Sequence, residues 1–117
     1  MKHNLIFSQK FYSEKKSIQL LDKIIQLFYT KCKEKKIKPI LLIIPQMHDL
    51  ISTNLNHLNY FNELNKKNNN VIDLTKFFKT KKIKDLYIED SYGGHLSEYG
   101  NRIVADKINI YLNNGKF

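Results

Sequence analysis

An unbroken apolar run, Pro-Ile-Leu-Leu-Ile-Ile at residues 39–44, is the feature that most constrains how this chain folds. It follows a charged turn at 33–38 and ends at Pro45. The run is too short for a buried helix but suits a β-strand that is covered on both faces. Pro45 cannot donate a hydrogen bond to a neighbouring strand, so the strand is expected to end there. A strand of this kind needs a layer of helices on each face, which favours an α/β fold.

The segments on either side of this run alternate between helix and strand. Helices are predicted at 13–35 and 53–67, because apolar residues recur in both at three- and four-residue spacing. These positions are Ile18, Leu21, Ile24, Ile25, Phe28 and Cys32 in the first helix, and Leu55, Leu58, Phe61 and Leu64 in the second. A second strand is predicted at 71–74, a further strand candidate is 4–7, and 76–84 is irregular or a short helix. The alternation predicts parallel strands joined by right-handed crossovers, in a single domain that spans residues 1–117.

Residues 93–105 place a histidine just before a third helix. Ser97 is the predicted N-cap, because a serine hydroxyl can accept hydrogen bonds from the unpaired amides of a first helical turn. The helix that follows has one apolar face, formed by Ile103, Val104, Ile108, Tyr111 and Leu112. Gly115 is in position to close this helix. His95 is therefore expected in the loop that leads into a packed helix.

This setting suits a general base at His95. An unperturbed imidazole has a pKa of about 6.5, which is well matched to proton transfer near neutral pH. Glu89 and Asp90, a few residues upstream, could orient the ring by accepting a hydrogen bond from its second nitrogen. Gly93 and Gly94 lack side-chain bulk and so leave room for a substrate. A structural alternative stays open, since two glycines before a capped helix also form an ordinary turn in which His95 is a polar loop residue.

The histidine block also resembles a known family. Gly94-His95-Leu96-Ser97, followed by Gly100-Asn101 and Val104-Ala105, resembles the last conserved block of the SGNH/GDSL hydrolases, which are serine esterases and lipases. Residues 38–45 and 71–75 are similar to core strands of that fold, so the resemblance covers roughly residues 14–112 as an order of elements. It implies a partial flavodoxin-like three-layer α/β sandwich, with two or three parallel strands flanked by helices. It also implies hydrolysis of carboxylic or acetyl esters through an acyl-serine intermediate.

Carried over by position, His95 matches the catalytic histidine of the family. The family's acid usually lies three residues before that histidine, where this chain has Tyr92. Asp90, five residues before His95, is the nearest aspartate and is the predicted acid. Glu89 is the second candidate for this role.

Two further residues are predicted to bind substrate. Gly94 directly precedes the histidine, and His48 lies in the loop 46–49 that follows the apolar strand. Open α/β sheets bind ligands at the carboxyl ends of their strands, which is where this loop begins. The alternative for His48 is a solvated loop residue.

The nucleophile of the family is missing from this sequence. The chain contains no Gly-Asp-Ser motif, and Ser8, which follows a short apolar segment, lacks the preceding Gly-Asp. Acyl transfer needs a nucleophile, a base and oxyanion donors close together. The chain is therefore predicted to be the C-terminal part of an ester hydrolase, inactive alone, that supplies the histidine. The alternative is a non-catalytic remnant or an interaction module.

The expected partners follow from the sheet edge and from the charge. An exposed apolar edge at the 40–44 strand calls for an N-terminal half or a second copy of the chain to cover it. Lysine and arginine number 20 against 11 acidic residues, for a net charge of +9. Nucleic-acid binding is nevertheless disfavoured, because the lysines are scattered and Arg102 is the only arginine, whereas base readout relies on arginine. A small-molecule or glycan ester is the expected substrate.

Neither a metal nor a cofactor is predicted. His48 and His57 are nine residues apart and Cys32 is the only cysteine, so no compact set of ligands of the zinc type is present. His3 and His57 are expected at the surface. The sequence shows no signal-peptide pattern and no apolar stretch near 18 residues, so no membrane span is expected and the default location is cytoplasmic.

Overall fold

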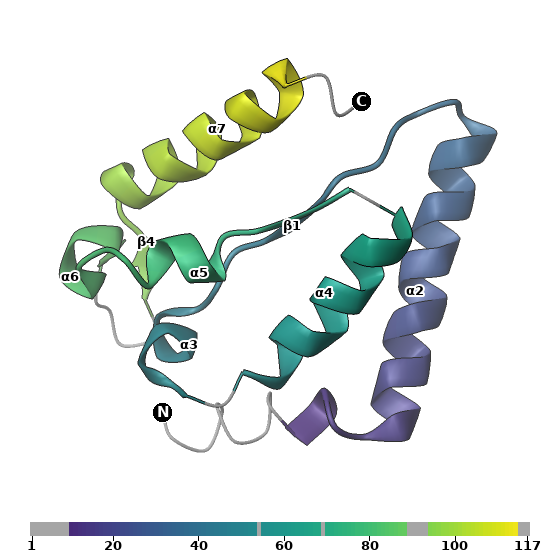
Figure 1. Cartoon of the computed structure of the whole chain (residues 1–117), viewed down its shortest axis with the longest axis horizontal. Helices are drawn as coiled ribbons and strands as arrows, with labels where there is room; N and C mark the ends of the chain where they lie inside the picture. Colours follow the sequence, from purple (N-terminus) through teal and green to yellow (C-terminus); the bar gives the residue numbers. More distant parts are fainter. Residues whose placement is uncertain (1–9, 54, 69, 89–93, 115–117) are drawn as a thin grey trace. The chain divides into compact units, whose positions relative to one another are not determined.

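The computed structural model describes residues 10–53, 55–68, 70–88 and 94–114. In chain order the elements are α2 (Lys15–Glu34), β1 (Leu41–Ile43), α3 (Met47–Ile51), α4 (Asn56–Asn68), β2 (Val71–Asp73), α5 (Thr75–Phe78), α6 (Ile83–Leu86), β3 (Tyr87–Ile88), β4 (His95–Leu96) and α7 (Glu98–Asn113) (Figure 1). The chain divides into two compact units. The α2–α4 unit consists of Met1–Leu41 and Thr53–Val71, and the His95 unit consists of Leu42–Ser52 and Ile72–Phe117.

Helix α2 confirms the helix predicted at 13–35 and ends in a well-defined turn. Lys36 has a φ of 57°, in the left-handed region. Its backbone N–H donates to the carbonyl of Lys33, and the N–H of Ile37 donates to the carbonyl of Cys32 at 2.8 Å. This pair of hydrogen bonds is the Schellman arrangement that closes many helices, in which the left-handed position usually holds glycine. The turn releases the chain toward β1.

Helix α4 confirms the second predicted helix and packs through an aromatic cluster. Leu55 and Phe61 are buried as the spacing predicted. The ring of Tyr12 lies 6.1 Å from that of Phe61 and 6.3 Å from that of Tyr60. The Tyr60 hydroxyl donates to Asp22 Oδ1 at 2.7 Å, and this hydrogen bond joins α4 to α2. Burial and the Asp22 carboxylate both raise the pKa of Tyr60 above its ordinary value.

The strands β1 and β2 pair in parallel, as the sequence predicted. The N–H of Leu41 donates to the carbonyl of Asn70 at 2.9 Å, and the N–H of Leu74 donates to that of Ile43 at 3.0 Å. The expected burial of the first strand on both faces is wrong. Residues 41–43 are only half-buried and Ile44 is 40% exposed. In the described part of the chain β1 pairs with β2 alone, so the other edge of β1 has no neighbouring strand.

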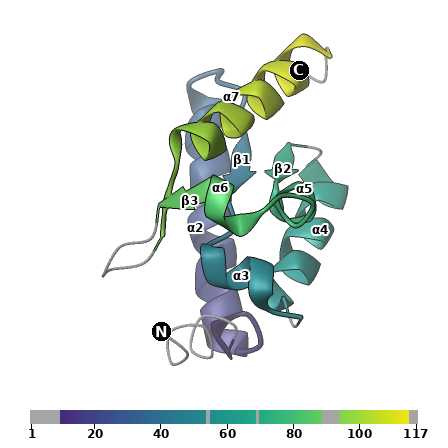
Figure 2. The ribbon, with the colours of Figure 1, turned by 90° about the vertical axis from the view of Figure 1, so that its left-hand side faces the viewer.

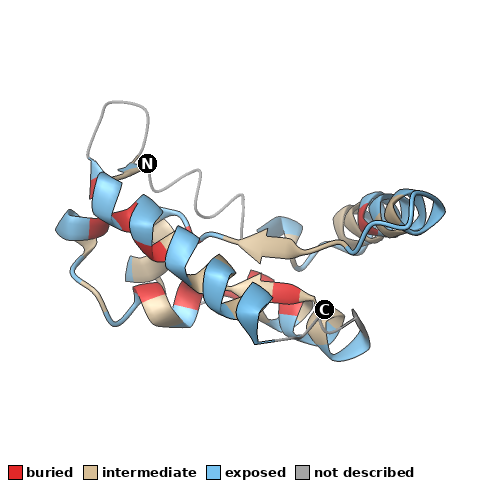
Figure 3. Cartoon of the chain, turned by 90° about the horizontal axis from the view of Figure 1, so that it is seen from above, coloured by how far each residue is buried: buried red, intermediate tan, exposed pale blue. Residues whose placement is uncertain are grey.

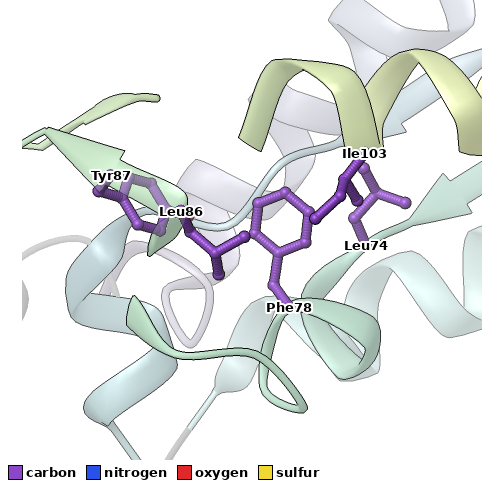
Figure 4. Packing of buried hydrophobic residues seen from close by; sticks show 5 residues of the cluster. All are labelled: Leu74, Phe78, Leu86, Tyr87 and Ile103. Atoms are coloured by element: carbon purple, nitrogen blue, oxygen red, sulfur yellow. The ribbon is translucent and has the colours of Figure 1, made fainter. Parts of the chain in front are cut away.

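The His95 unit has a compact hydrophobic core (Figure 4). Its buried members are Leu74, Phe78, Leu86, Tyr87 and Ile103. They come from the end of β2, from α5, from the α6–β3 junction and from α7. The predicted inward face of α7 is confirmed at Ile103 and Val104, which pack in or against this core, but Leu112 is exposed.

The result is a mixed helix and strand structure with a two-stranded parallel sheet, consistent with the α/β class. The strand candidate at 4–7 and the predicted helix end at Gly115 fall outside the described residues. None of the helices in the described ranges is long and apolar enough to cross a membrane.

Candidate functional site

His95 lies on a short strand rather than in the loop that the sequence predicted. β4 pairs antiparallel with β3, so that His95 is opposite Ile88 and Leu96 is opposite Tyr87. The side chain of His95 is exposed, whereas Leu96 packs against the core. Because successive strand residues point to opposite faces, Leu96 anchors the strand while His95 faces outward.

The helix start after His95 is built as predicted. The Ser97 hydroxyl accepts a hydrogen bond from the Gly100 N–H at 3.0 Å and donates to the Asp85 carbonyl at 2.6 Å. The Ser97 N–H also donates to the Leu86 carbonyl at 2.8 Å. Ser97 is therefore committed to capping α7 and to holding it against α6. This role leaves its hydroxyl a poor choice as a nucleophile.

Gly100 has a packing role that the sequence pattern did not reveal. A Cβ atom at this position would come within 2.5 Å of the Leu86 carbonyl oxygen and 3.1 Å of the Leu96 side chain. Only glycine lets the first turn of α7 approach the backbone of α6 this closely. The His95 strand is thereby clamped between α7 and the α6–β3 junction.

Gly94 brings the His95 strand against α3. A Cβ atom on Gly94 would lie 3.2 Å from Tyr87 Cβ and 3.4 Å from Met47 Sδ. The space that was expected to admit substrate is thus filled on this side by the protein's own side chains. A substrate-binding role for Gly94 stays a prediction, which now rests on its backbone rather than on empty space at Cβ.

Tyr87 is the residue at this site that sequence reasoning missed. Its buried hydroxyl donates to the Pro45 carbonyl at 2.5 Å, and it thereby ties the β3–β4 hairpin to the end of β1. Burial, with a smaller contribution from the Asp49 carboxylate, raises the pKa of Tyr87 to about 12. No local pattern marks Tyr87 in advance, because its partner lies 42 residues away in the sequence.

The carboxyl ends of β1 and β2 are each followed by a short helix. His48 is a half-buried residue of α3, not a loop residue, and α3 is capped by reciprocal hydrogen bonds between Gln46 and Asp49. After β2, Asp73 Oδ1 accepts from the Thr75 N–H at 2.8 Å, which starts α5. α3 and α5 pack together (Figure 2). His48 therefore follows the carboxyl end of β1, Asp73 ends β2, and Gly94 lies near Met47 of the helix that carries His48.

The described residues do not provide the acid partner, the nucleophile or a metal site that would complete a catalytic site around His95. Asp90, Glu89, Tyr92 and Gly93 fall outside the described residues, so the acid partner of His95 stays a prediction. Thr75 is wholly buried and cannot reach a substrate. Within the described ranges, no group of three or more histidine, cysteine or acidic side chains is placed to hold a metal ion.

The expectation that His57 lies at the surface is wrong. It is 5% exposed, in the α2–α4 unit, with its ring 5.8 Å from that of Tyr12. It occupies the first turn of α4, between the buried positions Leu55 and Phe61. Its burial follows from the packing of Tyr12 over this turn, which the spacing within α4 could not show.

Comparison of the chain with known protein families, with curated proteins and with solved structures gave no match to any of them.

Proposed function

We propose that this chain supplies the general-base histidine, His95, of an ester hydrolase of the SGNH/GDSL type. The observation that supports this most directly is the packing of Gly94 against Met47 and Tyr87. This contact brings the strand that bears His95 next to α3, which follows the carboxyl end of β1, and open α/β sheets bind ligands at the carboxyl ends of their strands. The exposed imidazole on a clamped strand combines access to substrate with a defined position.

The proposed reaction needs a serine from a Gly-Asp-Ser segment, which this sequence does not contain. The His95 imidazole would take the proton of that serine hydroxyl as its oxygen attacks the ester carbonyl carbon. The resulting imidazolium would then give the proton to the departing alcohol, which leaves an acyl-serine. A water molecule, deprotonated by the same imidazole, would release the carboxylic acid and restore the serine. His48 is proposed to border the substrate, and Asp90 to orient the ring.

A generic ester such as p-nitrophenyl acetate tests this proposal. The chain alone should be inert, and co-expression with a half that carries the Gly-Asp-Ser segment should produce turnover. In that reconstituted pair His95→Ala should lower kcat by about 10³-fold or more. His3→Ala, which removes an imidazole from the other end of the sequence, should leave kcat unchanged.

Two results would contradict the proposal. One is reconstituted turnover that His95→Ala leaves unchanged, which would assign the base to another residue. The other is a stable complex of the two halves that hydrolyses no ester, which would favour a non-catalytic interaction module.

A further inference from the structure

Only part of the apolar face of α2 is buried. On a helical projection its apolar residues span more than half of the circumference. One side of this arc, with Ile18, Leu21 and Ile25, is buried or half-buried. The other side is exposed, and comprises Leu20, Ile24, Leu27 and Phe28. Figure 3 views α2 nearly end-on and shows buried and intermediate positions concentrated on one side of the helix.

The four exposed residues, which we call the α2 stripe, form one continuous surface. Their spacing of four, three and one residues keeps them on the same side of the helix over about 12 Å of its length. Leu20 is 61% exposed and Leu27 is 60% exposed, so these side chains stand out from the helix instead of folding back onto it. A contiguous group of large exposed apolar side chains indicates an interaction surface, whereas single exposed apolar residues are common on any protein.

The charges around the α2 stripe are positive. Lys16 and Lys23 border it and are both exposed, and among the described residues neither makes an ion pair. The two acidic residues of α2 do not offset these lysines, because both already have partners. Asp22 accepts from the Tyr60 hydroxyl on the far side of the helix, and Glu34 pairs with Lys31 at 2.8 Å. The surface that covers the α2 stripe should therefore be apolar and carry negative charge.

We propose that the α2 stripe binds to the surface of a membrane that contains anionic lipid. A second copy of the chain fits poorly, because pairing of two stripes brings Lys16 and Lys23 toward their counterparts in a protein of net charge +9. A protruding ridge of leucine, isoleucine and phenylalanine enters the boundary between headgroups and acyl chains without a preformed groove. The flanking lysines extend their ammonium groups to the anionic headgroups.

Cosedimentation of the full chain with lipid vesicles tests this proposal. We expect binding to phosphatidylcholine vesicles that contain about 30% phosphatidylserine, and at least tenfold weaker binding to phosphatidylcholine alone. The double variant Leu20→Gln, Leu27→Gln should weaken binding to the anionic vesicles about tenfold or more. The matched control is Ile110→Gln, Leu112→Gln, which removes comparable exposed apolar surface from α7 and should not change binding. Far-UV circular dichroism checks that each variant keeps its helices.

A second pair of variants separates the flanking lysines from overall charge. Lys16→Gln, Lys23→Gln should weaken binding about tenfold, whereas Lys76→Gln, Lys84→Gln removes the same charge from other exposed positions and should have a smaller effect. If the two lysine double variants weaken binding equally, or if the leucine double variant does not weaken it, the binding is non-specific adsorption and the proposal is wrong. A dimer that depends on Leu20 and Leu27, or binding of an acidic helical peptide in place of vesicles, would overturn it in favour of a protein partner.

Discussion

The two units of this chain differ in how tightly their side chains are packed. In the His95 unit, Phe78 and Leu86 are wholly buried, and a glycine at position 100 lets two backbones come into contact. In the α2–α4 unit, helix α2 buries only Ile25, the ring of Tyr12 packs near those of Tyr60 and Phe61, and the hydrogen bond from Tyr60 to Asp22 joins the two helices. A candidate site that needs a fixed imidazole thus lies on the tightly packed unit. The proposed binding face, four exposed apolar residues gathered on one side of α2, lies on the other unit.

Truncation of a leucine in each unit should expose this difference most clearly. Leu86→Ala removes a side chain that is wholly buried in the core, and should lower the free energy of unfolding by about 3 kcal/mol or more. Leu20→Ala removes a leucine that is 61% exposed, and should change that free energy by less than about 0.5 kcal/mol. Urea unfolding followed by circular dichroism measures both. Similar losses in the two variants would show that the α2 stripe is covered in solution.

Gly100→Ala should be the next most damaging change. Alanine normally stabilises a helix relative to glycine, but the new Cβ would lie 2.5 Å from the Leu86 carbonyl oxygen and force α7 away from α6. We expect a loss of about 2–3 kcal/mol in the free energy of unfolding. Gly94→Ala serves as the graded comparison, because its Cβ would meet Tyr87 Cβ at 3.2 Å, and its loss should be smaller. A stabilising Gly100→Ala would show that α7 does not approach α6 this closely.

Tyr87→Phe should lower the free energy of unfolding by about 1–2 kcal/mol, as measured by urea unfolding, because it removes a buried hydrogen bond and leaves the Pro45 carbonyl without this donor. Tyr60→Phe, at a less buried hydroxyl of the α2–α4 unit, is the control and should lower the free energy of unfolding by less.

The pKa of Tyr87 is raised from 10.0 to about 12, so as the pH rises the unfolded chain loses the hydroxyl proton before the folded chain does. Its contribution to stability is therefore full below about pH 10 and is lost as the pH rises toward 12. Unfolding between pH 9 and about pH 12 should depend less steeply on pH in Tyr87→Phe.

The smallest expected effect is a gain in the α2–α4 unit. Lys36 has a φ of 57°, where a side chain costs energy that glycine avoids. Lys36→Gly should raise the free energy of unfolding by about 0.5–1 kcal/mol. Lys35→Gly is the matched control, because Lys35 has a φ of −91° and gains nothing from glycine there. If both variants destabilise equally, the turn after α2 is not the one described.

Features that depend on near neighbours in the chain were predictable from the sequence. The spacing of apolar residues located α2 and α4, and the hydroxyl of Ser97 marked the start of α7. His95 was correctly expected just before that helix, although the structure places it on a strand. Pairing of β4 with β3 depends on two segments that meet only after the chain has turned, and a two-residue strand carries no periodicity of its own.

The amino-acid sequence was enough to locate the main helices and the helix cap, because hydrogen bonding and side-chain periodicity along a segment are local. It indicated the parallel strands only through the alternation of helix and strand along the chain. Packing between distant segments decided that His57 is buried, that Ile44 is exposed, and that Leu20, Ile24, Leu27 and Phe28 of α2 are exposed in the part of the chain that the structure describes. It also decided the contacts of Gly94 and Gly100 and the hydrogen bond of Tyr87 to Pro45. The physical reason is that burial depends on what packs against a residue, which the residue's own neighbours in sequence do not specify.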